Sequence, residues 1–220
     1  MKPLKRESFT EMHPKVIAMY ESVLDLLDKG TDLTVMKVSD ITRHAGIGKG
    51  TAYEYFDCKE DIIAGAIVYD MERMVTSIKK KYEILTDFTS RVNASFDWIM
   101  EGMNGQNAFS RFIYYSSQYD VIGKAIIKNV KNKKAEDFSP VVLLRQLCEN
   151  GREEGKIRED LKPDEAAMML IGNMVTLIMC ISHISFESKS PHPDGARFAG
   201  SIDLDKMKDA LCSGFLKSVA

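Results

Sequence analysis

The spacing of apolar residues along the chain predicts a protein built from helices. A first helix begins near Pro14 and ends before Gly30, because apolar residues between them recur at i, i+4, i+7 and i+8. Proline at the start and glycine just past the end are typical of helix boundaries. The residues of this apolar stripe are Val16, Tyr20, Val23, Leu24 and Leu27.

Two short helices with a tight turn between them are predicted next. Val38, Ile41 and Ala45 keep helical spacing, and an amphipathic run follows over residues 49–56. The turn at 46–48 begins with a glycine, which can adopt the positive φ that ends a helix. We therefore expect a helix-turn-helix, in which Ala45 is small enough for the two helices to cross closely and Ile47 fills the angle between them.

The rest of the chain also has helical periodicity, with no strand-like alternation. A long helix from Lys59 to about Tyr82 is expected to connect the two halves of the chain. The segment 166–184 is almost wholly apolar, which predicts a helix buried on every side. Residues 186–201 are rich in Ser, Pro, Gly and His and are predicted to form a long loop. The other predicted helices cover residues 89–102, 108–119, 122–133, 140–154 and 204–219.

Composition places the chain among ordinary globular proteins. Of its 220 residues, 45% are hydrophobic and 28% are charged, and the net charge is -2. This charge argues against a protein that coats nucleic acid indiscriminately, so any contact with DNA must come from a local patch. The length suits a small and a larger helical domain, which we place at residues 1–58 and 59–220.

Candidate catalytic and metal sites are not apparent in the sequence. The four cysteines and four histidines are scattered without metal-ligand spacing, and we interpret the cysteines as reduced thiols. No nucleophile and base pairing or phosphate loop suggests an enzyme, and no cofactor is expected. The start of the chain is polar and no stretch reaches about 18 uninterrupted apolar residues, so we expect a cytoplasmic protein without a membrane partner.

The second helix of the predicted helix-turn-helix carries groups suited to DNA. Lys49, Thr51, Tyr53 and Tyr55 offer donors and rings near its exposed surface, and Gly50 would let the backbone approach a DNA strand. Such a helix fits a major groove, and its positive N-terminus attracts phosphate.

Residues 45–56, followed by Lys59 and Glu60, match the pattern A-G-[VI]-x-[KR]-G-[TS]-x-Y-x-[YH]-F and then K-E. This stretch resembles the DNA-binding segment of TetR/AcrR-type transcriptional regulators, over about residues 14–70. The resemblance implies that Gly50, Thr51, Tyr53 and Tyr55 contact DNA and that Lys59 contacts a phosphate.

The chain departs from that family pattern at two positions. Lys37 stands where members usually have a Thr or Ser that caps the helix and touches a phosphate, and Gly48 stands where they usually have Ser. We keep Lys37 as a candidate DNA contact, and Thr34 is an alternative source of the cap.

The C-terminal part is expected to sense a small molecule. Thirteen methionines are many for this length, and flexible methionines suit irregular ligands as well as ordinary cores. Aromatic and sulfur side chains could converge on a cavity between helices that accepts an apolar or amphipathic effector. The candidate ligand-binding residues are Met71, Met74, Trp98, Phe112, Tyr115 and Met174.

A helix-turn-helix reads one short half-site, so we expect a homodimer on a palindromic operator in double-stranded DNA. The apolar helices at 166–184 and 204–219 are the predicted dimer interface. The sequence thus predicts a ligand-responsive DNA-binding regulator, a repressor that a small molecule releases from its operator. The alternative is a DNA-binding regulator with no small-molecule effector, either constitutive, protein-regulated or activating.

Overall fold

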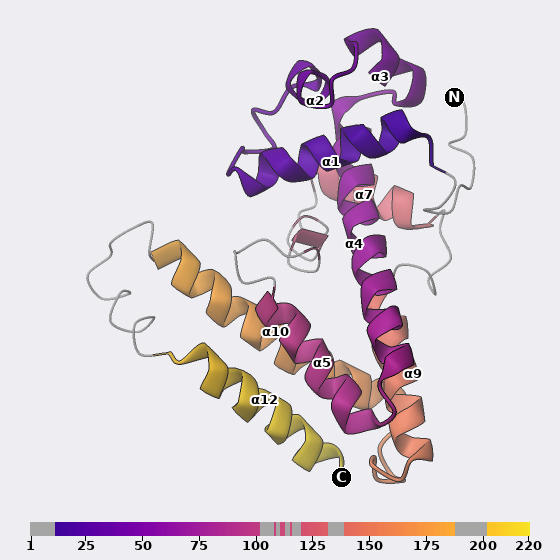
Figure 1. Cartoon of the computed structure of the whole chain (residues 1–220), viewed down its shortest axis with the longest axis vertical. Coiled ribbons are helices and arrows are strands. Elements are labelled where there is room, and N and C mark those ends of the chain that lie inside the picture. The colour runs from indigo at the N-terminus through magenta and orange to yellow at the C-terminus, as the bar shows by residue number, and fades with distance from the viewer. Residues whose placement is uncertain are drawn as a thin grey trace. The chain divides into compact units, whose positions relative to one another are not determined.

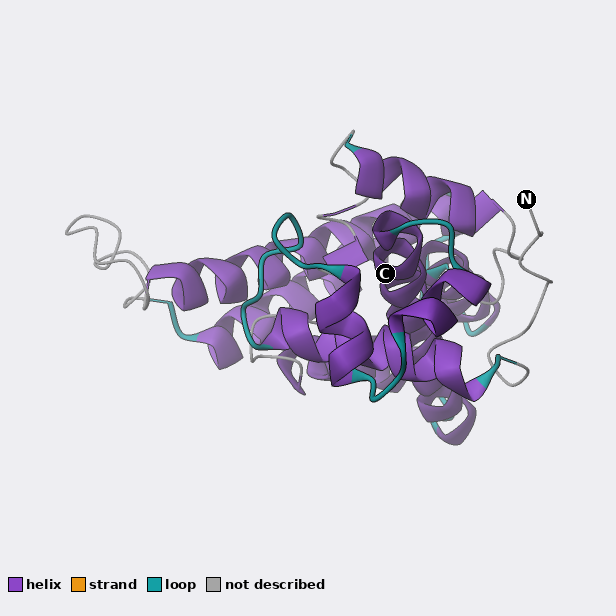
Figure 2. Cartoon of the chain, turned by 90° about the horizontal axis from the view of Figure 1, so that it is seen from above, coloured by secondary structure: helices purple, strands orange, loops and turns teal. Residues whose placement is uncertain are grey.

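The computed structural model of the chain contains helices and connecting turns, and no strand occurs among the residues that it describes (Figure 2). The predicted all-α fold class is therefore confirmed. The side chains of α10 are described as far as residue 181. The described residues are 12–101, 108, 111, 112, 115, 120–131, 139–187 and 202–220.

The chain forms two compact units. The first contains residues 1–74 and 108–138, and the second contains residues 75–107 and 139–220. The long helix α4 (Lys59–Ile84) contributes to both. This division by packing differs from the functional boundary predicted after residue 58, which stays a prediction.

The first unit carries the predicted helix-turn-helix (Figure 1). Helix α1 packs against α2, and α2 packs against α3. Gly30 after α1 and Gly46 after α2 have φ values of 81° and 68°, so each provides the left-handed residue that ends its helix. The other helices of this unit are α1 (Pro14–Asp28), α2 (Val38–His44), α3 (Lys49–Tyr55) and α7 (Val121–Lys131).

The start of α2 differs from one sequence-based alternative. Lys37 is the N-cap residue, and its backbone N–H donates to the Asp40 carboxylate at 3.1 Å. Thr34 does not cap this helix, because its N–H and its hydroxyl both donate to Asp32 Oδ1, each at 2.7 Å. Asp40, the third residue of α2, thus satisfies the N–H of the N-cap residue. The sequence-based alternative was a cap by the Thr34 hydroxyl.

Tyr20 is central to the core of the first unit. Its ring centroid lies 5.7 Å from that of Phe56 and 5.5 Å from that of Tyr69. Its hydroxyl lies over α4 at Gly65, where an added Cβ would come within 2.3 Å of the oxygen. Gly65 therefore sets the close approach of α1 to α4.

The second unit is a bundle around α10. Helix α10 packs against α9, α12 and α5. It begins three residues before the predicted start at 166 and continues through Glu187, into the segment predicted as a loop. Residues 188–201, the rest of that predicted loop, lie outside the described residues. The helices are α5 (Phe88–Glu101), α9 (Pro140–Glu153), α10 (Pro163–Glu187) and α12 (Leu204–Val219).

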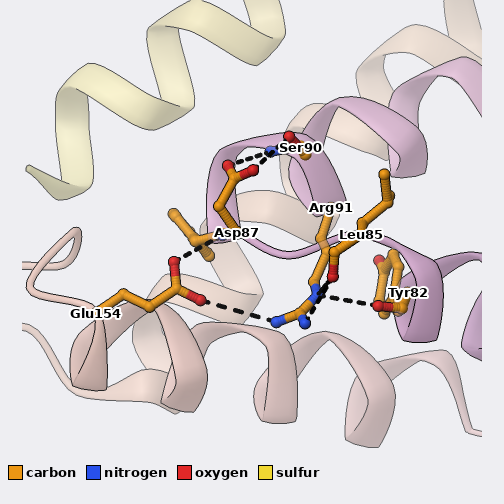
Figure 3. Close-up of polar contacts among 7 residues, drawn as sticks. Tyr82, Leu85, Asp87, Ser90, Arg91 and Glu154 are labelled. Atoms are coloured by element: carbon orange, nitrogen blue, oxygen red, sulfur yellow. Dashed lines mark hydrogen bonds and ion pairs between the residues drawn. The ribbon is translucent and has the colours of Figure 1, made fainter.

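A network of hydrogen bonds fixes the corner between α4 and α5 (Figure 3). Arg91 donates to the carbonyl oxygens of Tyr82 and Leu85 at 2.8 to 3.2 Å and lies 3.7 Å from the Glu154 carboxylate. Glu154 in turn accepts the N–H of Phe88 at 2.8 Å. The carbonyls left free at the end of α4 and the N–H at the start of α5 are therefore satisfied by one ion pair.

Within one chain, one side of helix α10 is exposed, so the burial on every side expected from its composition stays a prediction. Met168 and Met179 are 60% and 64% exposed, and Gly172 and Thr176 lie exposed between them. By length and composition alone, Pro163–Ile181 would also suffice to cross a membrane. Its opposite side packs against three helices of the bundle, as a core helix does.

Two thiols of the second unit are held in their protonated form. Burial raises the pKa of Cys148 to about 12 and that of Cys212 to about 11. Both values lie well above neutral pH, where the reactive thiolate is therefore scarce.

Candidate nucleic-acid interface

Helix α3 has one buried and one open side. Ala52 and Phe56 are only 1% and 3% exposed, whereas Tyr53 is 53% exposed and Lys49 and Gly50 are exposed beside it. Lys49 Nζ lies 6.0 Å from the centre of the Tyr53 ring. The predicted contact side of α3 is thus accessible, with a cation next to an amphipathic ring.

A groove of about 680 Å³ runs beside this side of α3. Segment 34–39, which leads into α2, lines one part of it, and Lys49 and Tyr53 line another. Lys59, at the start of α4, completes the lining. The groove brings together four of the seven predicted DNA-binding residues, namely Lys37, Lys49, Tyr53 and Lys59.

Lys59 has a structural partner that the motif did not indicate. Its Nζ donates to the carbonyl oxygens of Leu33 and Thr34 at 3.2 and 3.3 Å. The adjacent turn is also fixed by Thr34, whose hydrogen bonds to Asp32 hold the pKa of that carboxyl below its usual value. Lys59 therefore ties the wall of the groove to α4.

The remaining predicted DNA contacts lie on α3 outside the lining of this groove. Gly50 is exposed and Thr51 is half-buried. Tyr55 is half-buried, and its ring centroid lies 5.2 Å from that of His13. His13 is the N-cap residue of α1, so this ring contact joins the end of α3 to the start of α1.

The charge of the interface is local and positive. Three lysines line the groove, and the nearby Arg43 side chain is 79% exposed on α2. Among them lies Asp40, which accepts the N–H of Lys37 and is 3.8 Å from Arg43. The interface can therefore attract phosphate although the whole chain carries a net charge of -2.

We predict that Lys49 contacts phosphate only, whereas Lys59 contacts phosphate and also anchors the turn at residues 33–34, and that Lys49→Ala and Lys59→Ala distinguish these roles. Lys49→Ala should leave stability unchanged and reduce the slope of log affinity for DNA against log salt by about one. Lys59→Ala should also lower the free energy of unfolding by about 1 kcal/mol, because two hydrogen bonds to the turn are lost. Chemical denaturation and salt titrations measure the two effects, and equal stability of the two variants would refute the anchoring role.

Sequence reasoning did not predict the other five lining residues as DNA contacts. They are Thr34, Val35, Met36, Val38 and Ser39. Their proximity to Lys37 in the sequence was the available signal, but none belongs to the motif in α3. Among the residues that the structure describes, no group of three or more His, Cys, Asp or Glu side chains is placed to hold a metal ion.

The predicted effector-binding residues are divided between the two units. Met71 and Met74 are buried in the first unit, and Phe112 and Tyr115 pack partly buried against its core. The half-buried Trp98 and the buried Met174 belong to the second unit, and the convergence of all six residues stays a prediction.

Comparison with known proteins finds similarity to transcriptional regulators. No family model matches the chain. An HTH-type transcriptional regulator of Staphylococcus aureus (strain MRSA252) is 25% identical over 150 residues, which cover 65% of this chain and 76% of that protein.

Solved structures share the fold over nearly the whole chain. The fatty acid degradation regulator FadR from Bacillus halodurans has a TM-score of 0.67 and 18% identity, with 93% of this chain and 96% of that chain covered. FadR from Bacillus subtilis, solved in complex with stearoyl-CoA, has a TM-score of 0.67 and 14% identity, with 93% and 99% covered. A TetR-family regulator from Rhodococcus sp. has a TM-score of 0.64 and 14% identity, with 95% and 100% covered.

These comparisons agree with the resemblance drawn from the motif in residues 45–60, which they confirm. The similar proteins reported above are transcriptional regulators rather than enzymes. The arrangement of an N-terminal helix-turn-helix followed by a helical domain is likewise the fold of TetR-type regulators.

Proposed function

We propose that this chain, which has the fold of TetR-type transcriptional regulators, is a cytoplasmic DNA-binding repressor whose operator affinity responds to a small molecule. The observation that supports DNA binding is the groove beside α3. It gathers three lysines and the exposed Tyr53 ring around a helix that is held from behind by Ala52 and Phe56. A helix presented in this way can enter a major groove while the lysines neutralise flanking phosphates.

Selection of duplexes from a random oligonucleotide pool by the purified chain tests this function. We expect enrichment of a two-fold symmetric sequence with half-sites spaced by about one helical turn or a multiple of it. A folded chain that enriches no sequence over the starting pool would refute the proposal.

The operator symmetry requires a dimer, and we propose that α10 and α12 form its interface. Met168, Gly172, Thr176 and Met179 form an exposed, largely apolar stripe on α10. On α12, Leu211 is half-buried and Ala210 and Gly214 are exposed. Small residues on both helices would let two copies approach closely, and the methionines would supply the buried apolar area.

We predict that Gly172→Glu weakens the dimer at least tenfold. Among the described residues, and apart from its chain neighbours and the nearby backbone of its own helix, nothing lies within 4 Å of a Cβ added at Gly172. A single chain therefore tolerates the change, whereas a dimer would bury the new carboxylate. Analytical ultracentrifugation at several concentrations measures the dissociation constant, and Gln146→Glu on the exposed side of α9, outside the proposed interface, is the control that adds the same charge. An unchanged constant for Gly172→Glu would exclude this face of α10 from the interface.

For the effector we propose a long-chain acyl-CoA. The Bacillus subtilis FadR, which has the same fold, was solved with stearoyl-CoA. The apolar and amphipathic candidates Met71, Met74, Phe112 and Tyr115 suit an acyl chain. Calorimetric titration with stearoyl-CoA, with free CoA as control, should show micromolar or tighter binding of the acylated form only. Absence of binding by both would favour the alternative of a regulator without such an effector.

A further inference from the structure

One guanidinium joins three separate segments of the first unit. Arg111, in the segment that follows α5, is 9% exposed. Its Nη1 donates to Asp28 Oδ1 at 2.7 Å, its Nε donates to Asp70 Oδ2 at 3.0 Å, and its Nη2 also donates to Asp70 Oδ2. Asp28 is the last residue of α1, and Asp70 lies in the middle of α4.

The two arms of this ion-pair cluster differ in burial. The Asp70 side chain is 16% exposed, whereas the Asp28 side chain is 56% exposed. Separating Arg111 from Asp70 would leave a poorly solvated charge, so this arm is an anchor. Separating Arg111 from Asp28 costs little because water can solvate that carboxylate, so this arm can open and close.

The Asp28 arm places Arg111 at the C-terminal end of α1. The last turn of α1 contains no basic residue, and Arg111 adds positive charge near its carbonyl end beside the C-cap residue Lys29. Helix α1 packs on α2 and α2 on α3, so the contact at Asp28 restrains the recognition helix relative to α4.

We propose that the Asp28–Arg111 contact is the coupling element between the effector and the DNA-binding helices, an inference that rests on the function proposed above. Phe112 and Tyr115, candidate effector contacts, follow Arg111 by one and four residues and pack against the same core. An effector that displaces this segment pulls Arg111 away from Asp28 while the anchor at Asp70 holds. The closed contact favours the DNA-binding conformation, and opening it lowers the fraction of competent molecules.

The test measures binding of the full-length chain to its selected duplex for Asp28→Asn and a matched variant, Glu21→Gln. Both changes remove one exposed negative charge from α1, which by simple electrostatics would tighten DNA binding. Glu21 lies 3.8 Å from Arg73 and accepts the hydroxyl of Tyr69 at 3.4 Å, and among the described side chains it forms no ion pair with Arg111. We expect Asp28→Asn to bind at least about fivefold more weakly, the lower end of allosteric effects, and Glu21→Gln to bind equally or more tightly.

A stability measurement and a conservative variant distinguish a loss of coupling between effector and DNA binding from a general destabilisation of the fold. The melting temperature of Asp28→Asn should fall by less than about 3 °C, because the contact is exposed on one side. Asp28→Glu, which keeps the carboxylate, should restore affinity to within about twofold of the unaltered chain. Asp28→Asn binding as tightly as Glu21→Gln would overturn the coupling role alone. Absence of duplex binding by the unaltered chain would overturn the proposed function and this inference with it.

Discussion

Replacing Gly65 by alanine is expected to lower the free energy of unfolding by about 1 to 3 kcal/mol, the usual cost of overpacking a core. The added Cβ would lie 2.3 Å from the hydroxyl oxygen of Tyr20 and 2.6 Å from its Cζ. The ring is 6% exposed and held between Phe56 and Tyr69, so it cannot move aside freely. Alanine would otherwise favour the helix by up to about 1 kcal/mol, which makes a net loss informative.

Chemical denaturation at one fixed chain concentration measures this loss, since the proposed dimerisation would make stability depend on concentration. Gly50→Ala is the matched control in the same unit, because its added Cβ has no neighbour within 4 Å in the part of the chain that the structure describes, apart from its chain neighbours and the nearby backbone of α3. The control should be as stable as the unaltered chain or slightly more stable. If Gly65→Ala matched the control, the close approach of α1 to α4 described above would be incorrect.

Replacing Tyr53 by alanine is expected to weaken binding to the selected duplex at least tenfold without unfolding the protein. Tyr53 is 53% exposed and lies beside Lys49 on the open side of α3, so its ring and hydroxyl are available to base edges and phosphates. Surface substitutions of this kind change stability by no more than about 0.5 kcal/mol. Tyr53→Phe separates the two contributions, because it keeps the ring and removes only the hydroxyl. Fluorescence anisotropy with a labelled duplex measures the affinities, and unchanged binding by Tyr53→Ala would remove this residue from the interface.

Local patterns predicted most of the helix-turn-helix. The apolar stripe of α1 and the left-handed glycine at position 46 depend on neighbours within one or two helical turns, and both are visible in the sequence. The motif also predicted exposed positions on α3, of which Lys49 and Tyr53 are exposed, whereas Thr51 and Tyr55 are half-buried. Such features are determined by short-range geometry, which spacing records directly.

Contacts between distant segments were not predictable in this way. Arg111 meets Asp70 and Asp28, which are 41 and 83 residues away, and no local pattern marks these three residues as partners. The same holds for Lys59, where the motif implied a phosphate contact and the structure adds carbonyl partners 25 and 26 residues earlier. For α10, composition indicated a helix apolar on all sides but not which side packs within one chain, and the structure leaves Met168 and Met179 exposed.

The most direct test of the account is a comparison of the selected duplex with a scrambled duplex of equal length and composition. Titrations at several salt concentrations should show two chains bound per selected duplex and at least about a thousandfold preference over the scrambled one at physiological salt. Both affinities should fall as salt rises, because the lysines beside α3 release counterions from the DNA. Equal affinity for the two duplexes would contradict the claim that this chain is a sequence-specific DNA-binding regulator.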